Sequence, residues 1–96
     1  MLYNKEGVDK RAGKRKETVM ETYRFQVIIE IDEGGFYMAD VPALVGCHAQ
    51  GRTFEEALEN ISEVIEMCAQ EMREDGKPIE SRYPEVVGIK TLDISI

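Results

Sequence analysis

Apolar and polar residues alternate along residues 23–31, the most regular pattern in the chain. One face is apolar and the other is polar except at Ile28; the apolar face comprises Tyr23, Phe25, Val27, Ile29 and Ile31. A period of two with aromatic and β-branched residues is typical of a half-buried strand. An Asp-Glu-Gly-Gly turn at residues 32–35 follows, so residues 36–41 should return as the second strand of a hairpin.

The stretch after the hairpin holds turn and capping residues. Pro42 lacks a backbone N–H and should end the second strand or lie at its edge. Residues 43–45 form a short loop, and residues 46–50 are long enough for a third strand. Thr53 and Glu56 have the spacing of a capping box, in which the hydroxyl and the carboxylate accept hydrogen bonds from N–H groups at the start of a helix.

A helix is predicted from this cap to about Asp75, with Gly76 as its left-handed stop and Pro78 just beyond. Its apolar residues have the spacing of one buried stripe, which comprises Phe54, Ala57, Leu58, Ile61, Val64, Ile65, Cys68 and Met72. Residues 77–85 form a polar connecting loop. The stripe predicts a helix that is stable only when it packs on the sheet.

The last segment, residues 86–96, is rich in β-branched residues and predicts a fourth strand. Its phase shifts midway, since the earlier apolar residues share one face and the later ones the other: Val87 and Ile89, then Leu92, Ile94 and Ile96. A bulge, or an end used for subunit contact, would reconcile the two halves. The predicted fold is α+β in the order β-β-β-α-β, a three-stranded antiparallel meander and one further strand packed against one helix.

Composition adds a domain division and a charge asymmetry. The chain has 96 residues, of which 43% are hydrophobic and 32% charged, an ordinary globular composition of one-domain length. Residues 1–20 are rich in Gly, Lys and Arg without an apolar period, and we expect a flexible basic arm before an α+β domain at residues 21–96. The arm carries a formal charge of +3, so the domain carries −10 within a total of −7. Such a domain repels nucleic acid and favours a basic partner.

The arm has two alternative interpretations. One is a tail that touches nucleic acid, although Tyr3 is its only aromatic residue and offers no base-stacking platform. The other is an upstream start codon, with Met20 as the true first residue. No apolar run approaches the roughly 18 residues of a membrane span, and the N-terminus does not suit a signal peptide. We therefore expect a cytoplasmic protein.

Candidate catalytic groups are few. Cys47 and His48 are adjacent, and in an extended segment their side chains would point to opposite faces rather than meet. Two cysteines and one histidine are too few for a structural zinc site, and the glycines match no phosphate-binding loop. Glu30, Asp32 and Asp40 flank the hairpin and leave a metal-dependent nuclease as an alternative. Their surroundings favour a solvated surface, so we expect a protein that is not an enzyme and uses no metal or cofactor.

The predicted helix is strongly acidic, with eight acids against one base, Arg73. Its side opposite the apolar stripe includes Glu55, Glu59, Glu63 and Glu66. A solvated helix face would account for part of this pattern, but the charge is more one-sided than solubility requires. We expect these four glutamates to bind a basic protein partner.

Residues 23 to about 66 resemble the HicB-like antitoxin family. The resemblance rests on the acid–glycine turn, the aromatic pair Phe36 and Tyr37, and a series of spaced positions: Gly35, Pro42, Leu44, Gly46, Cys47, Gly51, Thr53, Glu56, Ala57 and Asn60. The residue types at these positions suit structural roles, with glycines at turns, Thr53 and Glu56 at the helix cap, and Ala57 where the helix approaches the sheet.

The resemblance implies a partial RNase H-like fold, without the catalytic acids of the nuclease. It also implies a non-enzymatic antitoxin that binds and masks a HicA-type toxin, a small basic RNA-cleaving protein, commonly as a homodimer or homotetramer. Many HicB proteins carry a C-terminal DNA-binding domain, and because this chain ends at Ile96 we expect no DNA binding. A stand-alone oligomeric binding module without a toxin is the alternative.

Overall fold

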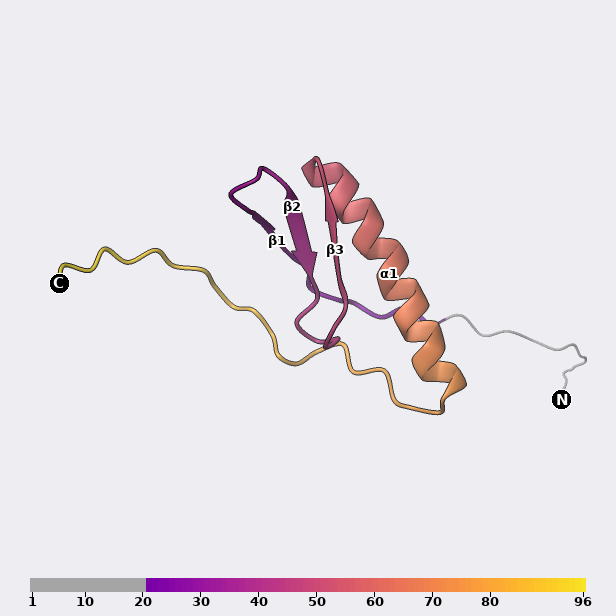
Figure 1. The fold of residues 1–96 in the computed structure, drawn as a ribbon. Coiled ribbons are helices and arrows are strands. Elements are labelled where there is room, and N and C mark those ends of the chain that lie inside the picture. Colours follow the sequence, from indigo (N-terminus) through magenta and orange to yellow (C-terminus); the bar gives the residue numbers. More distant parts are fainter. Residues whose placement is uncertain (1–20) are drawn as a thin grey trace, which may run out of the picture.

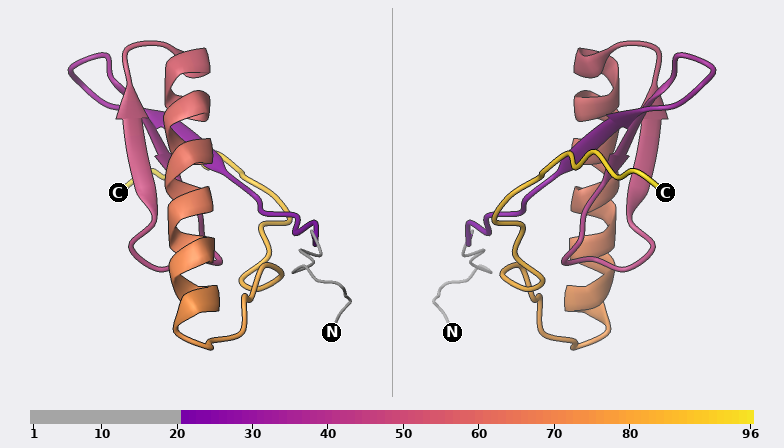
Figure 2. Two further views of the ribbon diagram at one scale, coloured as in Figure 1. Left: turned by 90° about the vertical axis from the view of Figure 1, so that its right-hand side faces the viewer. Right: turned by 90° about the vertical axis from the view of Figure 1, so that its left-hand side faces the viewer.

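The computed structural model describes residues 21–96, and the arm predicted for residues 1–20 lies outside the described residues. Three antiparallel strands and one helix follow in the order β1-β2-β3-α1, with bounds Ile28–Ile31, Tyr37–Asp40, His48–Gly51 and Phe54–Glu74. The helix lies across one face of the sheet, and the C-terminal segment leads away from both (Figures 1 and 2). This is an α+β fold of two layers, as the sequence predicts.

The first strand is shorter than the predicted residues 23–31. β2 is central and pairs with β1 on one side and β3 on the other. In the observed register, continuing the β1–β2 ladder beyond Ile28 would bring Gln26 opposite Pro42. Pro42 has no N–H to donate, and the chain turns there. The ladder therefore stops at Ile28, and the residues before it lie outside any strand.

The two turns of the sheet are closed by backbone hydrogen bonds. Between β1 and β2, the Asp32 N–H donates to the Phe36 carbonyl at 2.9 Å, and the Asp32 carboxylate accepts from the Phe36 N–H at 2.9 Å. Between β2 and β3, the Val41 N–H donates to the Cys47 carbonyl at 3.1 Å, and the chain between them turns twice. Gly46 in that turn has a φ of +82°, which favours glycine because it carries no Cβ.

The hydrophobic core lies between α1 and the sheet and is small. Its buried members are Ala39, Val41, Leu44, Cys47, Ala57 and Ile61. Phe25, Val27 and Ile29 pack against this core, as their alternation predicts. Ile31, at the end of the same apolar face, is 61% exposed. The predicted face is thus right along most of its length and wrong at the end nearest the hairpin turn.

The start of α1 confirms half of the predicted capping box. The Thr53 hydroxyl accepts a hydrogen bond from the Glu56 N–H at 3.0 Å, which satisfies one of the free donors of the first turn. The Glu56 carboxylate accepts from the N–H of Arg52 rather than from that of Thr53. The reciprocal bond is therefore shifted by one residue. A cap of this kind contributes about 1 kcal/mol to helix stability.

The end of α1 is the predicted glycine stop. Gly76 has a φ of +74° and its N–H donates to the Arg73 carbonyl at 3.0 Å. The Lys77 N–H donates to the Met72 carbonyl at 2.9 Å. Together these two bonds form a Schellman arrangement, which satisfies carbonyls that the helix leaves free at its last turn.

The predicted apolar stripe of α1 is right at most positions. Ala57 and Ile61 are buried, and the partly buried positions that pack against them are Val64, Ile65, Cys68 and Met72. The prediction is wrong at Phe54 and Leu58, because their side chains remain 49% and 45% exposed. Residues 21–96 therefore leave nearly half of each of these two side chains uncovered.

The prediction of a fourth strand at residues 86–96 is wrong, because residues 21–96 have the order β-β-β-α and no strand after α1. The apolar side chains of this segment are largely exposed, as at Ile94 with 73%. A strand needs a neighbouring backbone to pair with, and β-branched composition alone does not form one. The partial RNase H-like arrangement implied by the resemblance is therefore not confirmed.

Candidate functional site

The four glutamates predicted to bind a partner form a stripe along the outer face of α1. At about 100° per residue, these positions fall within an arc of about 80° and lie opposite Ala57 and Ile61, which face the sheet. They span about 17 Å of the helix axis. All of them are exposed: Glu55, Glu59, Glu63 and Glu66. We call these four residues the acidic stripe.

No basic side chain of residues 21–96 forms an ion pair with the acidic stripe. Within residues 21–96, the only ion pair joins Arg73 to Glu21 at 4.0 Å, near the C-terminal end of α1. Like charges at i and i+4, as at Glu55, Glu59 and Glu63, repel each other by about 0.2–0.5 kcal/mol per pair. A cationic surface bound to the stripe would relieve this repulsion. No helix of the described chain combines the length and apolar character needed to cross a bilayer.

The hairpin carboxylates do not form the centre that a metal-dependent nuclease needs. Asp32 accepts the Phe36 N–H in the turn, whereas Glu30 and Asp40 lie in different strands and are paired with Met38 and Ile28. All three acids are exposed. Nowhere in residues 21–96 do three acidic, histidine or cysteine side chains converge as metal ligands would. The arrangement gives this alternative no support.

The adjacent Cys47 and His48 do not share a face. Cys47 is fully buried in the core, whereas His48 is exposed at the start of β3. Desolvation by burial, with smaller contributions from the Cys68 thiol and from Asp40, raises the pKa of the Cys47 thiol to about 11. The thiol therefore stays protonated at neutral pH and acts as a small apolar core residue rather than a nucleophile.

The raised pKa of Cys47 predicts a loss of stability at alkaline pH. The unfolded thiol releases its proton near its ordinary pKa of 9.0, whereas the folded thiol holds it to about 11. The stability that the protonated Cys47 thiol contributes is fully present below pH 9, and the free energy of unfolding falls as the pH rises from about 9 to 11. Urea denaturation across this range should show a shallower fall for Cys47→Ala than for the wild type. Cys68→Ala is the control and should keep most of the fall. Equal slopes for the wild type and Cys47→Ala would contradict this assignment.

The positions that carry the family resemblance all have structural roles. Gly35 and Gly46 have positive φ values, of 88° and 82°. Leu44, Cys47 and Ala57 are buried, Pro42 begins the turn after β2, and Thr53 and Glu56 cap α1. Gly51 and Asn60 lie where β3 meets the helix, and the Asn60 amide donates to the Gln50 carbonyl at 2.8 Å. None of them belongs to the acidic stripe.

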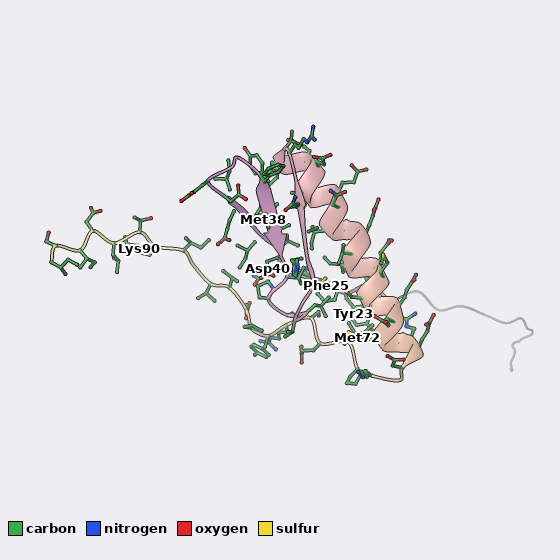
Figure 3. The ribbon with its side chains drawn as sticks, viewed as in Figure 1. Tyr23, Phe25, Met38, Asp40, Met72 and Lys90 are labelled. Carbon is green, nitrogen blue, oxygen red and sulfur yellow. The ribbon has the colours of Figure 1, made fainter. Side chains whose placement is uncertain are left out.

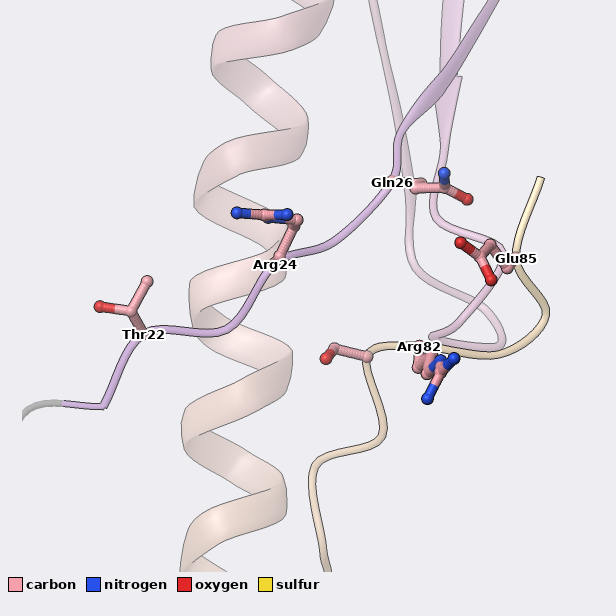
Figure 4. A pocket seen from close by; sticks show the side chains of 6 residues that line it. Thr22, Arg24, Gln26, Arg82 and Glu85 are labelled. Atoms are coloured by element: carbon pink, nitrogen blue, oxygen red, sulfur yellow. The ribbon is translucent and has the colours of Figure 1, made fainter. Parts of the chain in front are cut away.

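Sequence reasoning did not find a polar hollow of about 410 Å³ between the segment before β1 and the loop after α1. It is lined by Thr22, Arg24, Gln26, Ser81, Arg82 and Glu85 (Figure 4). At its edge the Gln26 amide donates to the Val86 carbonyl at 3.2 Å and accepts from the Val86 N–H at 2.6 Å. The polar face of the alternating segment was the only signal for Gln26, since its partner lies 60 residues away. These bonds anchor the start of the C-terminal segment.

The structure is a small two-layer α+β domain with an exposed acidic stripe on its helix. The comparison with protein families then identifies the domain more closely. A family model described as a HicB-like antitoxin of bacterial toxin–antitoxin systems matches residues 25–90. The chain belongs to the HicB-like antitoxin family.

Curated relatives are UPF0150 proteins from bacteria and archaea. One from Synechocystis is 47% identical over 53 residues, which cover 55% of this chain and 77% of the relative. One from Archaeoglobus fulgidus is 33% identical over 73 residues, covering 74% of this chain and 94% of the relative. One from Helicobacter pylori is 43% identical over 60 residues, which cover 62% of this chain and 82% of the relative. No solved structure matches the chain significantly.

Proposed function

We propose that this domain is a non-enzymatic antitoxin that binds and masks a HicA-type toxin, a small basic RNA-cleaving protein, through the acidic stripe of α1. The observation that carries the proposal is the row of exposed carboxylates without described basic partners, in a chain of an antitoxin family. A toxin that cleaves RNA needs a basic surface for phosphates. The acidic stripe competes for that surface.

The physical advantage of this arrangement is electrostatic steering. A domain with a formal charge of −10 over residues 21–96 attracts a cationic protein before contact, and the stripe then orients it. Because α1 is capped at both ends, the carboxylates are held on a rigid element. We place the complex in the cytoplasm, where RNA is available and where free thiols such as Cys47 and Cys68 are ordinary. The antitoxin itself acts as a homodimer or homotetramer.

Neutralising part of the stripe should slow association with the toxin. Glu59→Gln/Glu63→Gln removes two adjacent charges without changing side-chain length, and we expect the association rate at low salt to fall roughly tenfold. The salt dependence of the rate should also become shallower. Stopped-flow or surface-based kinetics at two ionic strengths measures both effects.

The matched control removes the same charge from another surface. Glu30→Gln/Glu33→Gln changes two exposed glutamates at the hairpin and leaves α1 untouched. This variant should lower the association rate by about twofold at most, since its charges act only at long range. Equal losses for the two double variants would show that net charge matters and that the stripe is not the binding face.

The proposal as a whole predicts that a small basic protein is encoded beside this chain, and co-expression of the two tests it. Tagged antitoxin should retain that protein at low salt and release an increasing share of it as the salt concentration rises. Absence of such a neighbour, or its failure to co-purify at low salt, would overturn the toxin-binding proposal.

A further inference from the structure

The C-terminal segment, residues 86–96, leaves the body of the molecule (Figure 1). Its large apolar side chains from Val87 onward are exposed. The exposed fractions are 92% at Val87, 84% at Ile89, 68% at Leu92, 73% at Ile94 and 118% at Ile96. A Cβ placed on Gly88 would have no heavy atom within 4 Å, so the segment is also open around its backbone. In its second half, Leu92, Ile94 and Ile96 alternate with polar residues, as in a strand with one buried face.

The body has a matching uncovered region along β1. Ile31 of β1 is 61% exposed, and Phe54 and Leu58 of α1 are 49% and 45% exposed. At about 100° per residue, both helix positions lie within about 20° of Ile65 around the axis. Ile65 lines a hollow with Tyr23 and Phe25, in the segment that leads into β1. Phe54 and Leu58 therefore lie on the side of the helix above β1.

The length of the elements explains why this region stays open. The 21-residue α1 is about 32 Å long, whereas the four-residue strands each span about 13 Å. Tyr23 and Phe25 lie beside the C-terminal half of the helix, where they line a hollow with Ile65 and Arg73 (Figure 3). The N-terminal half, on the β1 side, has no such cover among residues 21–96.

The two edge strands of the sheet, β1 and β3, differ in how far the helix covers them. At β3, the Asn60 side-chain amide donates a hydrogen bond to the Gln50 carbonyl at 2.8 Å. A Cβ on Gly51 would lie 2.5 Å from the Ala57 nitrogen, so β3 and the helix are in close contact. The helix therefore closes the β3 edge. At β1, no described strand pairs with the outer edge. An open strand edge beside exposed apolar side chains is a template for a further strand.

We propose that two copies of this chain exchange their C-terminal segments, with residues 92–96 of each copy pairing along the outer edge of β1 in the other. In this arrangement Leu92, Ile94 and Ile96 cover Ile31, Phe54 and Leu58 of the second copy. Residues 86–91 form the connecting arm and reach about 20 Å when extended. The fourth strand predicted from the sequence is then formed, but between chains.

The second copy is favoured over the chain's own edge by the path of the segment. The Gln26 amide holds Val86 beside the residues that lead into β1 of its own chain, and beyond Val86 the chain departs instead of docking there. Each copy carries both the donor strand and the acceptor edge, so a two-fold pair satisfies both at once and closes the assembly. The inference deepens the self-association proposed above and is independent of toxin binding.

The test measures mass and backbone protection on the full chain. Light scattering after size exclusion should give the mass of two chains, and hydrogen exchange should show protected amides in residues 28–31 and 92–96 that lose protection together on dilution. Ile94→Asp and, separately, Leu92→Asp should each weaken dimerisation by at least about tenfold. Both variants should keep the wild-type helical circular dichroism, because neither side chain is buried within its own copy.

Val45→Asp is the matched control, since Val45 is 102% exposed in the turn before β3 and lies outside the proposed interface. It should leave the dimer unchanged. A monomer with residues 92–96 protected would show docking on the chain's own edge and overturn the exchange. A dimer insensitive to both Ile94→Asp and Leu92→Asp would also overturn it. Neither result affects toxin binding, which is scored separately by co-purification.

Discussion

Gly51→Ala is expected to destabilise the domain by about 3 kcal/mol, a large part of the total stability of so small a domain. A Cβ at residue 51 would lie 2.5 Å from the Ala57 nitrogen and 2.9 Å from the Glu56 carbonyl carbon. These atoms belong to the helix backbone and cannot move aside as a flexible side chain can. The strand and helix must separate instead, which opens the core at Ala57. Chemical denaturation followed by circular dichroism measures the loss.

Gly88→Ala is the matched control for that substitution. A Cβ at residue 88 meets nothing within 4 Å, and Gly88 is not among the glycines with positive φ. The free energy of unfolding should change by no more than about 0.5 kcal/mol. If the two variants were equally stable, the close approach of β3 to α1 would be wrong.

Ile61→Ala should cost about 2–5 kcal/mol, because Ile61 is 0% exposed and is the largest fully buried side chain of the core. Truncation removes apolar contacts and leaves a cavity between α1 and the sheet. Few other buried side chains surround it, so little of the lost contact can be recovered by neighbours. A lower denaturation midpoint with a similar dependence on denaturant would show that stability, rather than compactness, has changed.

The control for Ile61→Ala lies on the same helix. Met67 is 66% exposed, and Met67→Ala keeps helix propensity high while removing little buried surface. Its effect should stay within about 0.5 kcal/mol. A loss at residue 67 comparable to that at residue 61 would mean that a different face of α1 packs on the sheet.

The sequence predicts those parts of the fold that depend on local chemistry. Thr53 and Gly76 bracket the helix because each satisfies backbone groups that a helix end leaves free, and both signals are readable without tertiary contacts. The hairpin is predictable for the same reason, since residues 32–35 carry turn chemistry. Strand length is different, because β1 extends only as far as β2 can pair with it, and Pro42 sets that limit from the other strand.

The errors concern residues whose partner is not local. Phe54 and Leu58 have the spacing of a buried stripe, but the pattern does not say whether an element covers them. The same holds for residues 86–96, whose strand-like composition is real but whose pairing depends on a neighbouring backbone. Gln26 and Val86 are 60 residues apart, and no local pattern links them. All three cases lie along the β1 side of the molecule.

The candidate site is predictable as a pattern, but its geometry needs the helix. Glutamates at residues 55, 59, 63 and 66 are recognisable in the sequence as one side of a helix, and the structure places all of them on its exposed face. Their role in binding stays a prediction. That none of these glutamates forms an ion pair within residues 21–96 could not be predicted, because it depends on where the chain folds back.

The most direct test of the central claim is inhibition of RNA cleavage by the HicA-type toxin that the proposal expects as the partner of this chain. Purified toxin is incubated with RNA and increasing amounts of this protein at low salt, and the intact RNA is quantified. Masking predicts that cleavage falls in proportion to added antitoxin and stops near one antitoxin site per toxin, with Glu59→Gln/Glu63→Gln requiring several-fold more protein. Undiminished cleavage at about tenfold molar excess of the folded wild-type chain would contradict the account.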